Sequence, residues 1–183
     1  RRMVVRFFED GISQAAAALS YFLLFSLLPL LMFVNALVAR LGISIITAHE
    51  ADASKFQEEF KESFDVVVAD VPCSGLGVIR KKPDIRYKDP KEMERLPDLQ
   101  LKILCKQAEY VKKGGTLLYS TCTLVRRENE GVVEAFLKYR PDFETVPLDL
   151  PPVFPVNKTG MLTLVPGEYD TDGFFICRLR RKT

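Results

Sequence analysis

The sequence lacks the cysteine and histidine patterns of metal-binding and secreted proteins. It contains four cysteines, none of them in a C-x-x-C pair, and one histidine, His49. A structural zinc site draws its four ligands from closely spaced cysteines and histidines, so no bound metal is expected. The cysteines are also too sparse for a disulfide scaffold, and no cleavable signal is evident. Both observations favour a reducing cytoplasm.

A strong charge bias is missing too. Lys and Arg total 26 and Asp and Glu total 24, which leaves a formal net charge of +2. Any affinity for nucleic acid must therefore come from local clusters of Lys and Arg rather than from the charge of the whole chain. The 183 residues, 48% of them hydrophobic, are enough for one domain with a core of its own.

Charge is absent altogether from residues 11–39, which are apolar almost throughout. This run is longer than the ~20 residues that span a bilayer. Arginines at positions 1, 2 and 6 precede it, and this charge distribution is typical of an N-terminus on the cytoplasmic side. A membrane segment and a buried helix of a soluble protein both fit the pattern. Pro29 does not decide between them, because membrane helices tolerate proline when neighbours satisfy the freed carbonyl.

From Ile43 onward, short apolar runs alternate with helical patterns. Helices are predicted at residues 52–62, 97–111 and 128–140, and strands at 43–48, 64–69, 116–120, 161–165 and 174–179. This alternation predicts a three-layer α/β sheet with right-handed crossovers, finished by an antiparallel pair of strands. The uninterrupted Val66–Val68 run is typical of a strand buried on both faces. Gly114 and Gly115 are expected to follow the end of the second helix.

Two cysteines follow predicted strands directly. Cys73 lies in the segment Asp-Val-Pro-Cys-Ser-Gly at 70–75, and Cys122 follows Tyr-Ser-Thr at 119–121. Because the carboxyl ends of adjacent parallel strands share one crevice, the two thiols are expected to face one pocket, which suggests covalent catalysis. For Cys73 alone, a small buried hydrophobic side chain is an equally good interpretation. Cys105 and Cys177 are expected to pack in the core, and neither they nor His49 are assigned a role.

Residues 44–183 carry five motifs whose order and spacing are informative. They are Asp-Val-Pro-Cys-Ser-Gly at 70–75, Gly-Val-Ile-Arg-Lys-Lys-Pro-Asp at 77–84, Gly-Gly-Thr-Leu-Leu-Tyr-Ser-Thr-Cys at 114–122, Glu-Asn-Glu at 128–130 and Thr-Asp-Gly-Phe-Phe at 171–175. With these motifs the segment resembles the C-terminal part of the Sun/RsmB family of RNA cytosine-5 methyltransferases. The resemblance implies a truncated Rossmann-like sheet with helices on both faces. It also implies methyl transfer from S-adenosylmethionine to RNA, with 16S ribosomal RNA of the small subunit as the substrate.

The resemblance assigns roles to residues of the strand-end motifs. Carbon 5 of cytosine becomes nucleophilic once a thiolate adds at carbon 6. Cys122 matches the cysteine that makes this bond, and Cys73 matches the cysteine that helps to release the product. Asp70 matches the acid that lines the base and methyl site, where it would hold the exocyclic nitrogen or protonate the ring nitrogen. Asp70, Pro72 and Asp52 are the implied cofactor contacts, although Asp52 is also well placed to cap a helix N-terminus.

A basic loop follows Cys73 in the sequence. Arg80, Lys81, Lys82 and Arg86 are expected to contact RNA phosphates, and the loop also carries an aromatic ring suited to stacking on an unpaired base. A solvated charged surface is the alternative interpretation. The position of the loop beside Cys73 favours RNA, because charge next to a catalytic loop positions a polynucleotide.

Residues 1–40 resemble a different family. Phe-Phe-Glu-Asp-Gly at 7–11, four alanines at 15–18 and Ser-Leu-Leu-Pro-Leu at 26–30 are similar to the opening of the YihY/BrkB family of bacterial inner-membrane proteins. The sequence thus divides into an apolar helical segment, residues 1–43, and the C-terminal part of a methyltransferase catalytic domain, residues 44–183. Association with a membrane through residues 11–39 is expected if the first segment inserts.

The glycine-rich cofactor loop implied by the methyltransferase resemblance is not found upstream of residue 44. We therefore expect an incomplete cofactor site and weak binding of S-adenosylmethionine by these 183 residues. Two other functions stay open at this point. One is a fragment of a YihY/BrkB-type membrane protein, and the other is an inactive RNA-binding module that uses the basic loop alone.

Overall fold

The computed structural model describes residues 49–151, 154, 157–168 and 171–183. The chain divides into two compact units, Arg1–Glu50 and Ala51–Thr183, and the described residues belong almost entirely to the second. The predicted strand at 43–48 and the whole segment 1–43, with its candidate membrane span and its resemblance to the YihY/BrkB family, lie outside them. In the described ranges, no helix is both long enough and apolar enough to cross a membrane.

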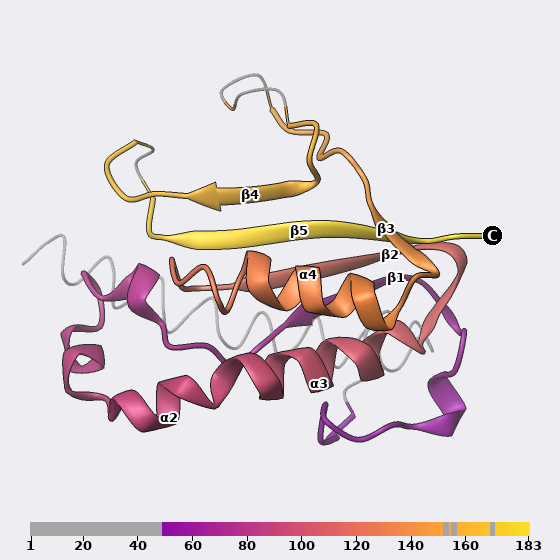
Figure 1. Ribbon diagram of the computed structural model, residues 1–183, viewed down its shortest axis with the longest axis horizontal. Coiled ribbons are helices and arrows are strands. Elements are labelled where there is room, and N and C mark those ends of the chain that lie inside the picture. Colours follow the sequence, from indigo (N-terminus) through magenta and orange to yellow (C-terminus); the bar gives the residue numbers. More distant parts are fainter. Residues whose placement is uncertain (1–48, 152–153, 155–156, 169–170) are drawn as a thin grey trace, which may run out of the picture. The chain divides into compact units, whose positions relative to one another are not determined.

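A mixed sheet forms the centre of the second unit (Figure 1). Its strands are β1 (Phe64–Asp70), β2 (Val111–Thr121), β3 (Phe143–Thr145), β4 (Met161–Leu164) and β5 (Phe174–Arg181). Their order is β1-β2-β5-β3, and β4 also pairs with β5. β1 and β2 are parallel, whereas β5 is antiparallel to β2, β3 and β4. The predicted parallel strands and the antiparallel pair that finishes the sheet are thereby confirmed.

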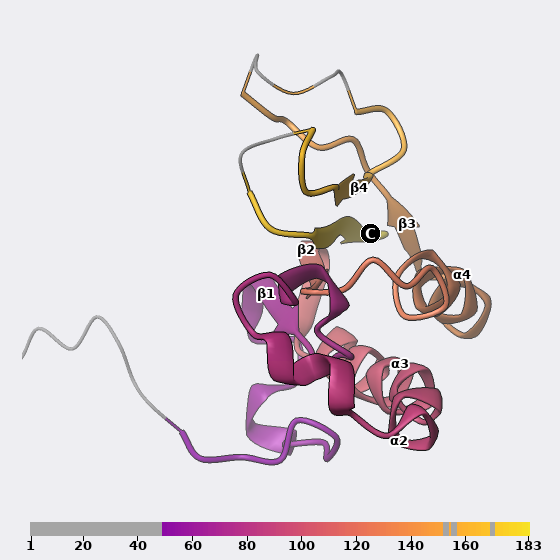
Figure 2. The same ribbon diagram turned by 90° about the vertical axis from the view of Figure 1, so that its left-hand side faces the viewer.

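Two helices, α3 (Leu96–Ala108) and α4 (Glu130–Tyr139), lie on the same face of the sheet (Figure 2). The short α2 (Pro90–Glu94) precedes α3, and short 3-10 helices occur at Glu58–Phe60, Leu76–Val78 and Pro83–Tyr87. α4 buries Val132, Val133 and Phe136, which share one side of the helix. It ends at Tyr139, two residues before Pro141, which cannot continue a helix and disfavours helical backbone at the residue before it. The helices predicted at 97–111 and 128–140 are confirmed apart from their ends.

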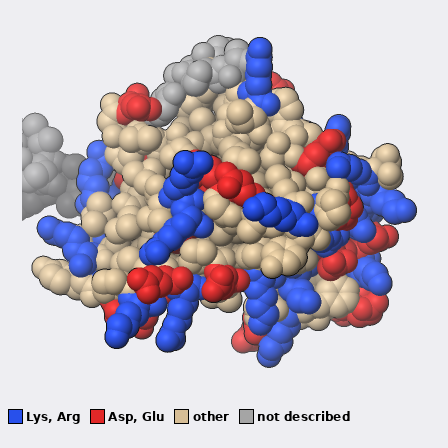
Figure 3. All heavy atoms as spheres, viewed as in Figure 1, with Lys and Arg blue, Asp and Glu red and all other residues tan. Residues whose placement is uncertain are grey.

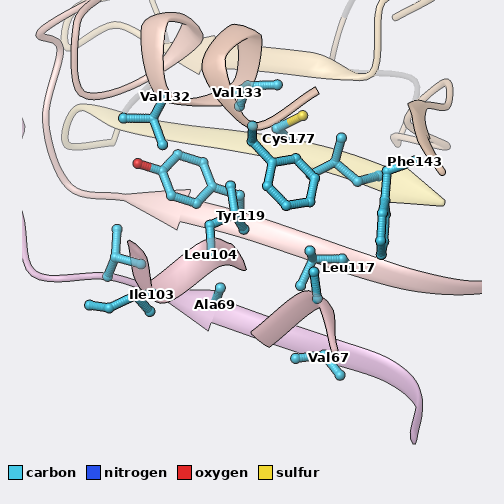
Figure 4. Packing of buried hydrophobic residues seen from close by; sticks show 14 of the residues in the cluster. Val67, Ala69, Ile103, Leu104, Leu117, Tyr119, Val132, Val133, Phe143 and Cys177 are labelled. Atoms are coloured by element: carbon cyan, nitrogen blue, oxygen red, sulfur yellow. The ribbon is translucent and has the colours of Figure 1, made fainter. Parts of the chain in front are cut away.

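The core lies between these two helices and the sheet (Figure 4). Alternate residues of β1 and β2 face the helices, as the two-residue period of a strand requires. These residues are Val67, Ala69, Leu117 and Tyr119. Leu104 of α3 and Phe136 of α4 are fully buried against them, and each such side chain contributes roughly 1.5–3 kcal/mol. The core therefore holds β1 and β2 in fixed register up to their carboxyl ends.

The charged helix predicted at residues 52–62 is wrong. Only Glu58–Phe60 forms a short 3-10 helix. Phe56 and Phe60 instead pack against the Tyr110 ring, and their ring centroids lie 5.7 and 5.8 Å from its centroid. Burial of these rings outweighs helix propensity, which is a weak determinant for so short a segment.

The boundary between α3 and β2 also differs from the prediction. Gly114 and Gly115 lie inside β2 rather than after a helix. The ladder shifts at this point, because Phe64 pairs with Val111 but Val66 pairs with Thr116. The extra residues of β2 form a bulge in which Gly114 has a φ of 76°, a conformation that glycine adopts without strain.

β1 is buried on one face only, contrary to the prediction. Val66 and Val68 are 57% and 61% exposed, whereas Val67 and Ala69 are buried. The expected helices on both faces of the sheet are, within the described part of the chain, found on one face (Figure 2).

Candidate active site

The carboxyl ends of β1 and β2 lie side by side. The parallel ladder pairs Asp70 with Ser120, so the loops that follow these residues leave the sheet at the same edge. Gly75 in the first loop has a φ of 78°, a left-handed conformation that allows the chain to turn sharply. Cys73 in this loop and Cys122 in the second therefore come together, as predicted.

The thiols of Cys73 and Cys122 are in direct contact. Their Sγ atoms are 3.0 Å apart, and the Cys122 backbone N–H donates to Cys73 Sγ at 3.3 Å. Burial raises the pKa of Cys73 to about 12, and the hydrogen bond with the Cys122 side chain adds to the rise. Cys73 therefore stays protonated at neutral pH, whereas nucleophilic attack requires a thiolate.

A cleft of about 450 Å³ opens in front of the two thiols. Residues that line it include Asp70, Pro72, Cys73, Lys82, Cys122 and Phe174. The Asp70 carboxylate is exposed, and its Oδ1 accepts a hydrogen bond from Ser120 Oγ at 2.8 Å. The structure thus brings the two cysteines together with Asp70, Pro72 and Lys82 from the sequence prediction. Phe174 at the start of β5 was not predicted as a site residue.

Further hydrogen bonds fasten the Cys73 loop to the Cys122 loop. The hydroxyls of Ser74 and Thr123 are 2.7 Å apart and buried. Gly77 N–H donates to the Cys122 carbonyl at 3.0 Å. A Cβ at Gly77 would lie 2.1 Å from the carbonyl oxygen of Gly173 and 2.9 Å from that of Cys122, so this approach of three backbone segments requires glycine.

A buried polar network lies behind the cysteines, and sequence reasoning missed it. Glu128 and Gln100 are both 0% exposed. Glu128 Oε2 accepts hydrogen bonds from the Ser74 backbone N–H at 2.9 Å and from Gln100 Nε2 at 3.0 Å. Asn129 Oδ1 accepts a hydrogen bond from Thr121 Oγ1 at 2.6 Å. The sequence signal was the Glu-Asn-Glu motif at 128–130, but polar residues at the start of a helix more often predict a cap than burial.

Contacts with a buried carboxylate divide the basic loop into two parts. Lys81 Nζ lies 2.6 Å from Asp172 Oδ2, and Arg80 lies 3.6 Å from Asp172 Oδ1. The Asp172 side chain is 5% exposed, and the hydrogen bond from Lys81 lowers its pKa. Lys82 lines the cleft instead, and Arg86 is exposed. The positive charge of Arg80 and Lys81 is therefore partly neutralised within the protein.

On the face shown in Figure 3, basic and acidic side chains are interspersed rather than separated into regions of one sign. This distribution agrees with the small net charge of the chain. Attraction of a polyanion to this protein would therefore depend on local groups such as Lys82 and Arg86.

Asp52 is not among the residues that line the cleft. Its Oδ1 accepts hydrogen bonds from Ser54 N–H at 2.9 Å and Ser54 Oγ at 2.8 Å. These bonds lower its pKa, and Lys55 lies 3.6 Å from its other oxygen. Asp52 therefore caps a turn, and the structure does not bring it together with Asp70 and Pro72.

The two remaining cysteines pack as predicted. Cys177 is fully buried in β5, and burial raises its pKa to about 12. Cys105 on α3 packs against the core, and burial raises its pKa as well. Among the residues that the structure describes, no three His, Cys, Asp or Glu side chains are grouped so that they would hold a metal ion.

Comparison with known proteins gives matches over most of the chain. The family described as 16S rRNA methyltransferase RsmB/F matches residues 31–180, so the match begins upstream of the boundary at residue 44 that the sequence analysis expected. A probable ribosomal RNA small subunit methyltransferase B of Bacillus subtilis is 50% identical over 149 residues, which are 78% of this chain and 33% of that protein. A ribosomal RNA small subunit methyltransferase F of Escherichia coli O157:H7 is 36% identical over 154 residues, 80% of this chain and 32% of that protein.

A solved structure of NSun6 from Pyrococcus horikoshii with SFG has a similar fold. Its TM-score is 0.60 and its sequence identity 26%, and the match covers 84% of this chain and 39% of the other. The chain spans about a third of the length of the curated relatives that it matches.

Proposed function

The chain belongs to the 16S rRNA methyltransferase RsmB/F family, and we propose that it transfers a methyl group from S-adenosylmethionine to carbon 5 of a cytosine in small-subunit ribosomal RNA. The observation that carries the proposal is the pair of thiols, 3.0 Å apart at the carboxyl ends of two parallel strands. We also propose a cytoplasmic location, because the proposed substrate, small-subunit ribosomal RNA, is found in the cytoplasm.

Cys122 is the nucleophile in this proposal. Addition of its sulfur to carbon 6 of cytosine makes carbon 5 electron-rich enough to attack a sulfonium methyl group. The choice of Cys122 over Cys73 rests on the Tyr-Ser-Thr-Cys segment at 119–122, which matches the family's nucleophile motif. Removing either side chain should therefore have different consequences for the covalent intermediate.

Cys73 assists release of the product. Release requires loss of the proton at carbon 5 and departure of Cys122 Sγ from carbon 6. The carbon 5 proton passes to water in the cleft, the electron pair of its bond forms the carbon 5–carbon 6 double bond, and Cys122 leaves as a thiolate. The protonated Cys73 thiol, with its Sγ 3.0 Å from the departing sulfur, can stabilise this thiolate by donating a hydrogen bond to it. Asp70 is exposed in the same cleft, where its carboxyl group would hold the exocyclic nitrogen or protonate the ring nitrogen.

The cofactor supplies the methyl group when bound, and membership of the family implies that it is S-adenosylmethionine. The match to a structure with SFG, an analogue of S-adenosylmethionine, supports this. Asp70 and Pro72 fit a contact to its methyl-bearing end, because both line the cleft that holds the thiols. Asp52 caps a turn outside that cleft, and its contact to the adenine end stays a prediction. Weak binding by these 183 residues also stays a prediction, which micromolar affinity in titration calorimetry would contradict.

The basic loop supplies contacts to RNA phosphates. Lys82 lines the cleft and Arg86 is exposed beside it. Arg80 and Lys81 are 64% and 69% exposed in spite of their ion pairs with Asp172. All four cations are therefore accessible to a polyanion, and Lys82 is the one of the four that lines the cleft with the thiols. Substitution of Lys82 by Gln should weaken RNA binding more than the same substitution of Lys81.

The test is covalent trapping. RNA that contains 5-azacytosine should form a denaturation-stable adduct with the wild-type chain in the presence of S-adenosylmethionine. The adduct should be lost in Cys122→Ala and kept in Cys105→Ala, the matched control. An adduct that survives in Cys122→Ala would overturn the assignment of the nucleophile. Equal RNA binding by wild type and Cys122→Ala, with no adduct in either, would favour an RNA-binding module without activity.

The N-terminal segment is proposed to be separate from this function. Its division from the catalytic part at residues 43 and 44, and its resemblance to the YihY/BrkB family, stay predictions, and the family match overlaps its last residues because it begins at residue 31. Solubility that depends on detergent would support association with a membrane through residues 11–39. Solubility without detergent, together with the adduct above, would contradict the membrane-protein alternative.

A further inference from the structure

Cys73 is held from behind at both of its neighbours in the chain. On one side, Gln100 Nε2 donates to the Pro72 carbonyl at 2.9 Å. On the other side, the Ser74 backbone N–H donates to Glu128 Oε2 at 2.9 Å. Gln100 Nε2 also donates to Glu128 Oε2 at 3.0 Å, so the two holding side chains are bonded to each other. The backbone around the thiol is therefore fixed from two directions by one bonded pair.

Both side chains of this pair lie in the interior. Gln100 and Glu128 are 0% exposed, whereas Cys73 is partly open to the cleft. Glu128 has no Lys or Arg partner in the described part of the chain, and its Oε1 has no hydrogen-bond partner there. A buried carboxylate without a cation costs free energy that an apolar pair would not. The hydrogen bond that Glu128 accepts from the Cys73 loop offers a reason for that cost.

The pair also connects Cys73 to β2, the strand that Cys122 follows. Tyr119 on β2 donates from its hydroxyl to the Glu128 backbone carbonyl at 2.6 Å. The position of Glu128 is therefore set by β2, while its side chain sets the position of Ser74 and with it Cys73. Each of these groups is buried, so water does not compete for the bonds.

We propose that Gln100 and Glu128 act as positioning residues that hold the Cys73 thiol against the Cys122 thiol. They contact neither substrate nor cofactor in this proposal, and they act through the Cys73 loop. The positioning of the two thiols does not depend on the proposed function. Only the consequence of that positioning for catalysis rests on it. A displacement of about 1 Å at a reacting group lowers rates by up to about two orders of magnitude.

The test measures the approach of the thiols directly. Diamide oxidises two nearby thiols to a disulfide, as each sulfur loses a hydrogen and diamide is reduced to the hydrazine. Closure of Cys73 and Cys122 is followed by mass spectrometry of the joined peptides, in the full chain carrying Cys105→Ser to limit side reactions. Closure should be at least tenfold slower in Glu128→Met, because the Met side chain offers no oxygen to accept the hydrogen bonds from Ser74 N–H and Gln100 Nε2.

Two further variants separate positioning from general stability. Glu134→Gln removes a carboxylate from α4 that is 59% exposed, and its closure rate should match that of the parent chain. Gln100→Met keeps the size of the side chain, removes both of its bonds and serves if Glu128→Met does not fold. Closure should be slowed in Gln100→Met as well, in samples that still melt cooperatively. Closure within twofold of the Glu134→Gln rate in both folded variants would overturn the proposal.

The outcome is independent of methyl transfer. If closure slows in the variants while the wild-type chain forms no RNA adduct, the positioning proposal holds and the proposed function fails. If the adduct forms in the wild-type chain while closure is unchanged in the variants, the proposed function holds and the positioning proposal fails.

Discussion

Behind the cleft, at the carboxyl ends of β1 and β2, several polar side chains are fully buried and joined by hydrogen bonds, whereas at the amino ends of the same strands the ion pairs are partly open to solvent. Ser74, Thr123 and Glu128 at the first end are all 0% exposed. At the second end, Arg140 and Asp142 lie 2.7 Å apart, and their side chains are 15% and 39% exposed.

The two kinds of contact differ in how precisely they fix the position of a side chain. A buried hydrogen bond fixes direction as well as distance, and breaking it leaves a group without a partner. An ion pair that is partly open to solvent competes with water for its partners and contributes less to stability. The protein therefore uses the first kind of contact where two thiols must meet, and the second kind where the helices and β5 only have to be fastened to the sheet. Four predictions test this contrast.

The largest expected effect comes from Gly77→Ala at the cleft end. The new Cβ would lie 2.1 Å from the Gly173 carbonyl oxygen, a backbone atom that cannot rotate away. We expect a loss of about 3 kcal/mol in the free energy of unfolding, measured by urea titration. Gly131→Ala on α4 is the matched control, since its Cβ would lie 3.3 Å from the nearest atom. Equal losses in the two variants would contradict the contrast.

Removal of a tyrosine hydroxyl at each end of β1 and β2 compares the two ends by the same chemical change. Tyr119→Phe leaves the fully buried Glu128 carbonyl without its 2.6 Å hydrogen bond, and should cost about 2 kcal/mol. Tyr110→Phe at the other end removes the acceptor of the Gln57 N–H at 2.8 Å in a less enclosed position, and should cost about 1 kcal/mol. Thermal unfolding of both variants provides the comparison, and a larger loss in Tyr110→Phe would reverse it.

The two ends should lose stability at opposite extremes of pH. Burial raises the pKa of Cys73 from 9.0 to about 12, so its contribution is complete below pH 9 and is lost as the pH rises toward 12. The hydrogen bond from Arg140 lowers the pKa of Asp142 from 3.8, so that contribution is present above pH 4 and is lost at lower pH.

Melting temperatures measured across the pH range separate these two contributions. Cys73→Ser should reduce the alkaline loss and leave the acid loss unchanged, although part of the alkaline loss should remain because burial also raises the pKa of Cys177 to about 12. Asp142→Asn should do the reverse. An acid loss that disappears in Cys73→Ser would show that the two ends are not independent.

The smallest effect is expected from salt. Arg140→Gln should cost about 1 kcal/mol at low ionic strength, and this cost should fall to a few tenths in 1 M NaCl, because salt screens partly exposed ion pairs. Ser74→Ala removes a buried neutral hydrogen bond, and its cost should not depend on salt. Urea titrations of both variants at two salt concentrations give the comparison. A salt-independent cost of Arg140→Gln would assign its contribution to packing rather than to charge.

Sequence patterns predicted the part of the site that depends on strands. The apolar runs that became β1 and β2 located Cys73 and Cys122, because the residue after a buried parallel strand lies at a common edge. The same patterns placed α4 within two residues of its observed start at Glu130. These features are determined by local periodicity and therefore can be recognised in a sequence.

Contacts between distant segments were not predictable in this way. The ion pairs of Arg80 and Lys81 with Asp172 join residues that no local pattern relates. The burial of Glu128 was missed for the same reason, since its partners lie on other elements. The helix predicted at residues 52–62 was wrong because Phe56 stacks on Tyr110, which lies far along the chain. This contact takes the place of a helical turn.

β5 lies in the interior of the sheet, between β2 on one edge and β3 and β4 on the other, although it follows every other described strand in the sequence (Figure 1). During synthesis, β1 and β2 leave the ribosome well before the strand that completes their sheet. Contacts between such distant segments form slowly, because the intervening chain must first be ordered. Phe174, the first residue of β5, also lines the cleft, so the cleft acquires its last wall only after nearly all of the described chain has emerged. A nascent chain therefore carries both cysteines for some time before it has a closed site in which to use them.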